Sequence, residues 1–159
     1  MLSLALSVGE DRFALGCADV VEVIPRVELR SIPHAPAFVP GLFTYRGAIV
    51  PVIDLCQLIR QSACPSKLSS RIIIVKPRGG TNRLIGLLAE RVIDTIHLDP
   101  KQAIPAGIEI ADTPYLGEVY LDVAAGTTTQ RLVVDGLVAG PLRGMMAERA
   151  TRGLVGGIE

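Results

Sequence analysis

Cysteine and histidine are the residue types most able to carry nucleophilic or metal chemistry, and the chain contains few of either. Its three cysteines are Cys17, Cys56 and Cys64, and its two histidines are His34 and His97. A structural zinc site needs four ligands at a recognisable spacing, which these residues do not supply. Buried or incidental thiols are the favoured interpretation, while a nucleophilic pair of Cys17 and His97 stays open. We expect no metal and no other cofactor.

Motifs of the common enzyme classes are also missing from the sequence. There is no G-x-S-x-G, no G-x-x-x-x-G-K-[ST] and no H-E-x-x-H. The glycine-rich segment 136–144 lacks the lysine and the spacing of a phosphate-binding loop. Asp94 and Asp99 flank an apolar stretch and are interpreted as solvated strand ends rather than a catalytic carboxylate pair. The sequence therefore predicts a protein that is not an enzyme, with a small-molecule-binding β-barrel as an alternative of another class.

The charges of the chain cancel, with 16 basic and 16 acidic residues. This balance argues against a nucleic-acid binder, because phosphate binding depends on a net positive face. Arginine dominates the basic residues and is favoured at protein interfaces, where its planar group offers five donors. Arg46 draws attention because it lies between an aromatic-containing stretch, Phe43 to Tyr45, and Gly47.

The mean hydropathy of +0.43 is high, so a membrane span had to be considered. The longest uncharged run, Ser31–Tyr45, contains three prolines and is shorter than the roughly 20 apolar residues that a spanning helix needs. The first residues lack the basic region and cleavage site of a secretory signal. We expect a cytoplasmic protein without direct membrane insertion.

The apolar residues are mainly aliphatic, with 16 Val and 15 Ile against three Phe, three Tyr and no Trp. β-Branched side chains favour strands because their restricted χ1 suits a pleated, half-buried surface. Glycine and proline interrupt the apolar runs at short intervals, which is typical of a β-barrel or β-sandwich. The pattern predicts strands at residues 2–8, 12–17, 20–24, 42–46, 48–53, 71–76, 84–88, 91–98, 115–123 and 131–135, with an alternating stretch at 27–32.

Loops and short helices are expected between these strands. Asp54 is placed to cap a helix that continues to Arg60, because its carboxylate can accept from the first free N–H groups. Residues 99–113 predict a loop, as do Gly126 and the three threonines that follow it, and residues 136–142 predict a closing helix or turn. The steps Asp54-Leu55 and Asp135-Gly136-Leu137 are similar, which suggests two related small barrels.

Several segments, taken in order, carry a family resemblance. In the first half they are residues 20–24 (VVEVI), 32–41 (IPHAPAFVPG) and 45–55 (YRGAIVPVIDL). A second block runs from residues 71–75 (RIIIV) to 86–92 (GLLAERV), and a closing block from Gly117 to Leu137. Over residues 3–142 these segments resemble the CheW family, the coupling adaptors of bacterial chemosensory arrays.

The resemblance implies a fold and a function. The fold would be all-β, with two small SH3-like barrels of five strands each packed together in one domain, residues 1–142, followed by a helical or weakly ordered tail at 143–159. The function would be that of a non-catalytic adaptor. Its partners would be the cytoplasmic tip of a methyl-accepting chemoreceptor and the regulatory domain of a CheA-type histidine kinase.

The matched motifs also imply roles for individual residues. The receptor- and kinase-binding residues are expected to be Arg46, Glu22, Val20, Tyr45 and Gly47. A structural role is favoured for Gly41, Pro51 and Asp54.

Three positions depart from the family pattern. Thr44 stands where asparagine is common, Glu90 where aspartate is usual, and Cys56 where arginine is common. These departures suit a variant from a dedicated pathway, such as surface sensing with cyclic-di-GMP output or twitching motility.

Overall fold

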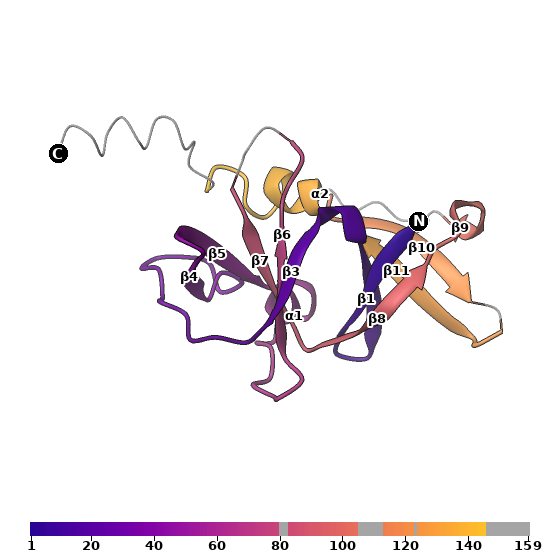
Figure 1. Cartoon of the computed structure of the whole chain (residues 1–159), viewed down its shortest axis with the longest axis horizontal. Helices are drawn as coiled ribbons and strands as arrows, with labels where there is room; N and C mark the ends of the chain where they lie inside the picture. Colours follow the sequence, from indigo (N-terminus) through magenta and orange to yellow (C-terminus); the bar gives the residue numbers. More distant parts are fainter. Residues whose placement is uncertain (80–82, 105–112, 123, 146–159) are drawn as a thin grey trace.

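The computed structural model describes residues 1–79, 83–104, 113–122 and 124–145, which form two β-sheets with short helices (Figure 1). Sheet A has the strand order β8-β1-β2-β11-β10-β9, and sheet B has the order β3-β6-β7-β5-β4. Sheet A contains β1 (Leu2–Val8), β2 (Asp11–Gly16), β8 (Arg91–His97), β9 (Ala103–Ile104), β10 (Leu116–Asp122) and β11 (Thr127–Leu132). Sheet B contains β3 (Val20–Pro25), β4 (Gly41–Tyr45), β5 (Ala48–Asp54), β6 (Arg71–Val75) and β7 (Ile85–Ala89). The helices are η1 (Cys17–Asp19), α1 (Leu55–Arg60), η2 (Pro100–Gln102) and α2 (Val134–Ala139).

The expected all-β fold is confirmed, but sheet A has six strands and not five. The additional strand, β9, is two residues long and pairs with β10 through Ala103 and Ile104. It follows η2, so part of the segment 99–113 has regular structure where the prolines predicted only a loop. Pro100 fits the first position of η2 because its missing N–H is not needed there.

Sheet B is built from one continuous stretch of chain, whereas sheet A is built from two. The chain forms β1 and β2 of sheet A, then all of sheet B, and then returns to sheet A at β8. Each sheet contains one parallel pair, β2 with β11 and β5 with β7. In each sheet the second strand of a hairpin, β5 or β11, leads directly into a helix, α1 or α2. The two halves therefore repeat one arrangement, as the two similar Asp-containing steps suggested.

A shared aliphatic core holds the two sheets together. The strand β6, which lies between β3 and β7, contributes Ile72, Ile73 and Ile74, and all three are fully buried. One continuous cluster joins them to Leu6 and Leu15 of sheet A. Helix α1 contacts β1 of sheet A as well as β5 and β7 of sheet B. Burying each such side chain contributes about 1.5–3 kcal/mol, so the sheets stabilise each other through this core.

The predicted cap of α1 is confirmed. One Asp54 carboxylate oxygen accepts from the backbone N–H of Gln57 at 3.1 Å, and the other accepts from the N–H of Cys64 at 2.9 Å. The carboxylate therefore holds the start of the helix and also the loop that follows it. The helix ends at Gln61, whose φ of 59° places it in the left-handed region.

Two expectations for the last quarter of the chain were wrong. The three threonines after Gly126 are the first residues of β11 and not a loop, and Thr129 is buried opposite Tyr120. Threonine is β-branched and suits a strand, whereas the turn is made by Gly126, with a φ of 67°. Helix α2 begins at Val134, within the segment expected to be the last strand.

The alternating stretch at residues 27–32 does not form a strand. Arg30 alone makes a bridge, with Leu42, through backbone hydrogen bonds of 2.8 and 2.9 Å. Prolines follow at positions 33, 36 and 40, and a proline has no N–H to extend the pairing.

Some expectations concern residues that the structure does not describe. The expected tail begins at Arg143, where residues 143–145 form a turn, and residues 146–159 lie outside the described part. Residues 80–82 and 105–112, which fall in expected turns and loops, also lie outside it. Among the described helices, none has the length and apolarity required to cross a bilayer.

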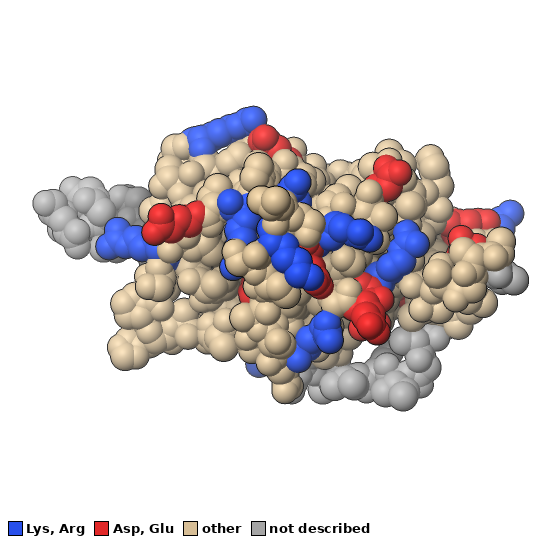
Figure 2. Space-filling view, turned by 90° about the horizontal axis from the view of Figure 1, so that it is seen from below, with Lys and Arg blue, Asp and Glu red and all other residues tan. Residues whose placement is uncertain are grey.

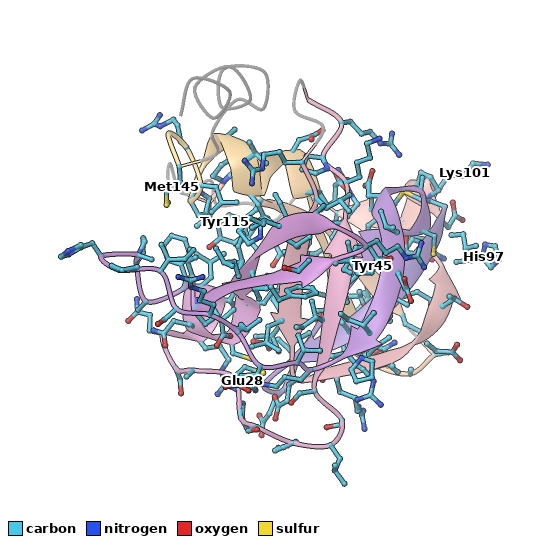
Figure 3. The ribbon with its side chains drawn as sticks, turned by 60° about the vertical axis from the view of Figure 1, so that its left-hand side comes forward. Glu28, Tyr45, His97, Lys101, Tyr115 and Met145 are labelled. Atoms are coloured by element: carbon cyan, nitrogen blue, oxygen red, sulfur yellow. The ribbon has the colours of Figure 1, made fainter. Side chains whose placement is uncertain are left out.

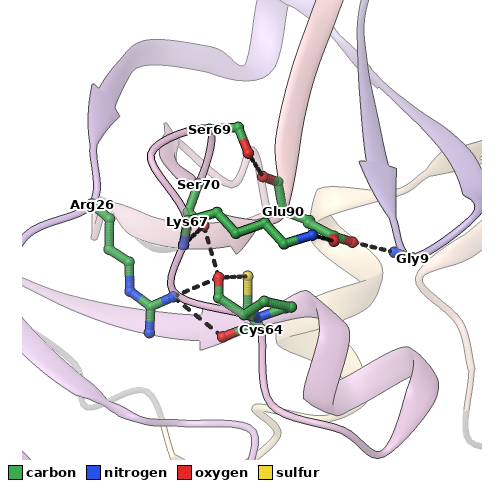
Figure 4. Close-up of polar contacts among 8 residues, drawn as sticks. Gly9, Arg26, Cys64, Lys67, Ser69, Ser70 and Glu90 are labelled. Carbon is green, nitrogen blue, oxygen red and sulfur yellow. Dashed lines mark hydrogen bonds and ion pairs between the residues drawn. The ribbon is translucent and has the colours of Figure 1, made fainter.

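Glu90, at the link where the chain returns to sheet A, connects the two sheets (Figure 4). Its carboxylate accepts from the N–H of Gly9 in the β1–β2 turn at 2.9 Å and pairs with Lys67 Nζ at 2.9 Å. Ser69 Oγ donates to the Glu90 carbonyl at 3.2 Å. The ammonium of Lys67 and the N–H of Gly9 hold the pKa of Glu90 below its ordinary value of 4.5.

Replacing Glu90 by glutamine is expected to lower the melting temperature at neutral pH. Because the folded-state pKa lies below the unfolded value, the carboxylate stabilises the fold above about pH 4.5, and this contribution disappears as the pH falls through the folded-state pKa. Thermal denaturation of wild type and Glu90→Gln between pH 3 and pH 7 should therefore show two curves that converge at the acid end. The same change at Glu10, an exposed turn residue, should have little effect. Parallel curves at all pH values would contradict this role.

Gly136 is a position where α2 approaches the backbone before β10 too closely for a side chain. A Cβ built there would lie 2.2 Å from the carbonyl oxygen of Pro114. Gly136→Ala is therefore expected to cost about 1–3 kcal/mol of unfolding free energy, measured by urea denaturation. Gly16→Ala is the matched control, since its Cβ would meet Asp19 at an ordinary 3.6 Å. Equal unfolding free energies of the two variants would show that the contact between α2 and the Pro114 backbone can adjust without loss of stability.

Candidate functional site

Four of the five residues expected to bind partners come together where the two edge strands of sheet B meet. Glu22 lies on β3, Tyr45 ends β4, and Arg46 and Gly47 form the turn between β4 and β5. Strands β3 and β4 are the opposite edges of the sheet order. The contacts of Glu22 with Tyr45 and Arg46 therefore close the sheet toward a barrel.

The turn itself fixes where Arg46 projects. Arg46 has a φ of 48° and Gly47 a φ of 80°, so both central residues of this two-residue hairpin are left-handed. Such turns match the twist of the flanking strands and favour glycine. A Cβ on Gly47 would meet nothing within 4 Å, so the glycine serves backbone conformation and not close packing. For Arg46 the left-handed conformation costs roughly 1–2 kcal/mol, which the surrounding contacts must offset.

Two contacts hold the Arg46 side chain. Its Nη2 lies 3.0 Å from Glu22 Oε1, and its guanidinium carbon lies 5.1 Å from the centre of the Tyr45 ring. The Tyr45 hydroxyl donates to the same Glu22 oxygen. The Arg46 side chain nevertheless stays 74% exposed, and Glu22 is 39% exposed. An arginine with this exposure and this orientation can contact a partner without first being ordered.

Electrostatics keep the Tyr45 hydroxyl in its donor form. Its hydrogen bond to the Glu22 carboxylate, followed by burial, raises the pKa of Tyr45 above its ordinary value. Its ring also packs edge-on against Phe43, with centroids 6.5 Å apart. The exposed pair of Arg46 and Glu22 contributes only about 0–1 kcal/mol to stability, so the cluster orients the arginine more than it stabilises the fold.

Val20 does not join this cluster. Its side chain is half-buried and packs against the core, as does Ile24 on the same strand. Val21 and Val23, which alternate with the half-buried residues of the strand, face outward and are 45% and 36% exposed. These two valines, and Ile49 of β5 at 56% exposure, were missed as candidates. Alternation along β3 could have identified the valines, because successive side chains of a strand face opposite sides.

The residues assigned a structural role lie away from the β4–β5 turn, at the start of β4 and in the second half of β5. A Cβ on Gly41 would come within 2.4 Å of the Arg30 carbonyl oxygen, so glycine allows the bridge between residues 30 and 42. Pro51 lies in β5 opposite Leu42. Asp54 is almost fully buried and caps α1.

The open pair of Cys17 and His97 is not brought together. Cys17 follows β2 and His97 ends β8, and β1 lies between these two strands. Two strand spacings separate their backbones by about 9–10 Å. His97 lines an open cavity of about 410 Å³ on sheet A together with Arg12 and Tyr120, but Cys17 does not line it. Figure 3 shows His97 and Lys101 at one edge of the molecule, away from the end that carries Tyr115 and Met145.

Among the described residues, one group has the composition of a metal site. Asp54, Cys56 and Cys64 are buried, and their ligand atoms lie within 4.8 Å of one another.

On the surface, charges of both signs alternate on the face shown in Figure 2, where Lys and Arg side chains lie beside Asp and Glu side chains. The candidate site is therefore built around one oriented arginine, Arg46.

Comparison with known proteins gives consistent results. A chemotaxis protein CheW from Rhizobium meliloti is 28% identical over 102 residues, which is 64% of either chain. A chemotaxis protein CheW from Klebsiella aerogenes is 28% identical over 103 residues, 65% of this chain and 60% of the relative. The matched segments thus span less than two thirds of these relatives. The crystal structure of the scaffolding protein TtCheW from Thermoanaerobacter tengcongensis is similar with a TM-score of 0.72 at 27% identity, covering 84% of this chain and 88% of that one.

The family model for the CheW-like domain matches residues 3–138, which is most of the chain. The two-sheet fold and the similarity to a CheW scaffold structure agree with this match. Proteins of this family are non-catalytic scaffold adaptors of chemotaxis, which agrees with the missing enzyme motifs. The chain belongs to the CheW family.

Proposed function

We propose that the chain couples methyl-accepting chemoreceptors to a CheA-type histidine kinase in the cytoplasm. It would bind the cytoplasmic tip of the receptor and the regulatory domain of the kinase, and receptor arrays would recruit it to the membrane. The observation that carries the proposal is the geometry of Arg46, which is 74% exposed yet held by Glu22 and Tyr45. Arginine and tyrosine are enriched among the few residues that dominate protein interfaces.

Preorganisation of the arginine supports the receptor part of the proposal. An immobilised long side chain costs about 0.5–1.5 kcal/mol on binding, and here the free protein already bears that cost. Tyr45 and Glu22 would act as positioning residues, while Gly47 would allow the turn that presents Arg46. Val20 would contribute by fixing β3 against the core, and the exposed Val21 and Val23 would add apolar contact area.

An adaptor must hold two partners at once, and exposed apolar side chains occur on both sheets. On sheet B they are Val21, Val23 and Ile49; on sheet A they are Leu2, Ile93, Ile104 and Leu121. Exposed apolar side chains of this kind can contribute contact area to a protein interface. We assign the receptor to the Arg46 side of sheet B, which leaves sheet A for the kinase domain.

Replacing Arg46 by alanine tests the receptor contact. We expect the affinity for a receptor-tip fragment to fall by at least tenfold, about 1.4 kcal/mol, as measured by isothermal titration calorimetry. Thermal stability should stay within a few degrees of wild type, because the side chain is exposed and its ion pair is weak.

Lys101→Ala is the matched control, since it removes an exposed cation from η2 on the other sheet and should leave the receptor affinity unchanged. Binding of the kinase regulatory domain should change little in Arg46→Ala, because Arg46 lies outside sheet A. Wild-type receptor affinity in Arg46→Ala would contradict the role of the arginine. Failure of the wild-type chain to bind either partner at micromolar concentration would contradict the adaptor function itself.

A further inference from the structure

Two thiols meet in the interior beside the start of α1. Cys56 is the second residue of the helix, and Cys64 lies in the loop between α1 and β6. Both side chains are buried, with 3% and 4% exposure. Their sulfur atoms and a carboxylate oxygen of Asp54 lie within 4.8 Å of one another.

Several hydrogen bonds fix the loop around Cys64, and Figure 4 shows those from Arg26 and Ser70. Asp54 accepts from the Cys64 N–H at 2.9 Å, and Arg26 Nη1 donates to the Cys64 and Pro65 carbonyls, at 3.2 Å each. Ser70 Oγ donates to the Pro65 carbonyl at 2.8 Å. These bonds hold the backbone on both sides of Cys64. The fixed loop backbone therefore places the two thiols close together. Their proximity does not depend on the rotation of one unrestrained side chain.

A metal ion fits this cluster poorly. The described residues supply three ligands, whereas structural zinc takes four. Both oxygens of Asp54 already accept backbone hydrogen bonds. The positive charge of Arg26, bound at Cys64, also opposes a cation. Two adjacent thiols with no metal partner are instead suited to oxidation.

We infer that Cys56 and Cys64 are a site of covalent modification, a dithiol that peroxide oxidises to an intramolecular disulfide. This inference does not depend on the adaptor function. The disulfide would tie the loop before β6 to α1, and α1 in turn packs against both sheets.

The reaction proceeds in two steps. The Cys64 thiolate attacks one oxygen of hydrogen peroxide, the O–O bond breaks, and a sulfenic acid and one water form. The sulfur of Cys56 then attacks the Cys64 sulfur, the S–OH bond breaks, and the second water leaves. Two thiols and one peroxide thus give one disulfide and two waters, and the two sulfurs supply the two electrons that reduce the peroxide.

The electrostatics support Cys64 as the first nucleophile. The adjacent Cys56 thiol lowers the pKa of Cys64, while Cys64 and burial raise the pKa of Cys56. Cys64 also lies in an irregular loop among exposed residues, Ser62, Ala63, Pro65 and Ser66. Opening of this loop would admit peroxide without unfolding a strand.

Peptide mapping tests the inference directly. Trypsin cuts after Arg46, Arg60 and Lys67, so Cys56 and Cys64 fall in separate peptides, 47–60 and 61–67, and Cys17 falls in 13–26. After treatment of the reduced chain with hydrogen peroxide, a non-reducing digest should contain a peptide 47–60 joined to 61–67, about 2 Da lighter than the two together. The link should disappear on reduction, and the number of free thiols should fall from three to one.

Variants separate this pair from general oxidation. Cys17→Ser should form the same linked peptide as wild type, whereas Cys56→Ala and Cys64→Ala should not form it. Mapping of the wild-type chain decides the question even if a variant fails to fold. Oxidation of Cys17 with Cys56 and Cys64 still alkylatable would overturn the inference. So would links between chains only, or one equivalent of Zn²⁺ bound tightly enough to protect both thiols.

Discussion

The carboxylate of Glu22 is the group on which the proposed binding site depends. It is the single acceptor for both the Tyr45 hydroxyl and the Arg46 guanidinium, and it lies on the opposite edge strand of sheet B. A backbone turn in the left-handed region presents Arg46, and the carboxylate then fixes its direction. One exposed ion pair contributes little to stability. The main effect of this pair is to order the Arg46 side chain while leaving it exposed.

The shared core makes this geometry possible. The strand β6 pairs with β3 and packs fully buried within the cluster that unites both sheets. The edge strand that carries Glu22 is thereby fixed relative to the rest of the fold, and Val20 and Ile24 anchor it from the inner side. Sheet B is inserted in the sequence between the two parts of sheet A. Unfolding of one sheet would therefore disrupt the other. Glu90 and the cap at Asp54 reinforce this link.

Much of the fold could be predicted from the sequence, because Val- and Ile-rich runs between turn residues define strands by local chemistry. The cap at Asp54 was predictable for the same reason. What failed depended on tertiary pairing: the threonines of β11 joined a strand because β2 and β10 flank them, and β9 formed in a segment whose prolines predicted only a loop. At the site, the R-G motif identified Arg46, but the outward-facing valines of β3 were missed. The meeting of Cys56 with Cys64 depends on the path of a loop, which spacing alone does not encode.

A double-mutant cycle on receptor-tip binding tests the central claim most directly. The four proteins are wild type, Glu22→Gln, Arg46→Ala and the double variant, with affinities measured by calorimetry. If Glu22 acts by orienting Arg46, its substitution should weaken binding in wild type but not in the Arg46→Ala background, which gives a coupling free energy of about 0.5–3 kcal/mol. Additive effects of the two substitutions would show that Glu22 and Arg46 contact the partner independently, and would contradict the account.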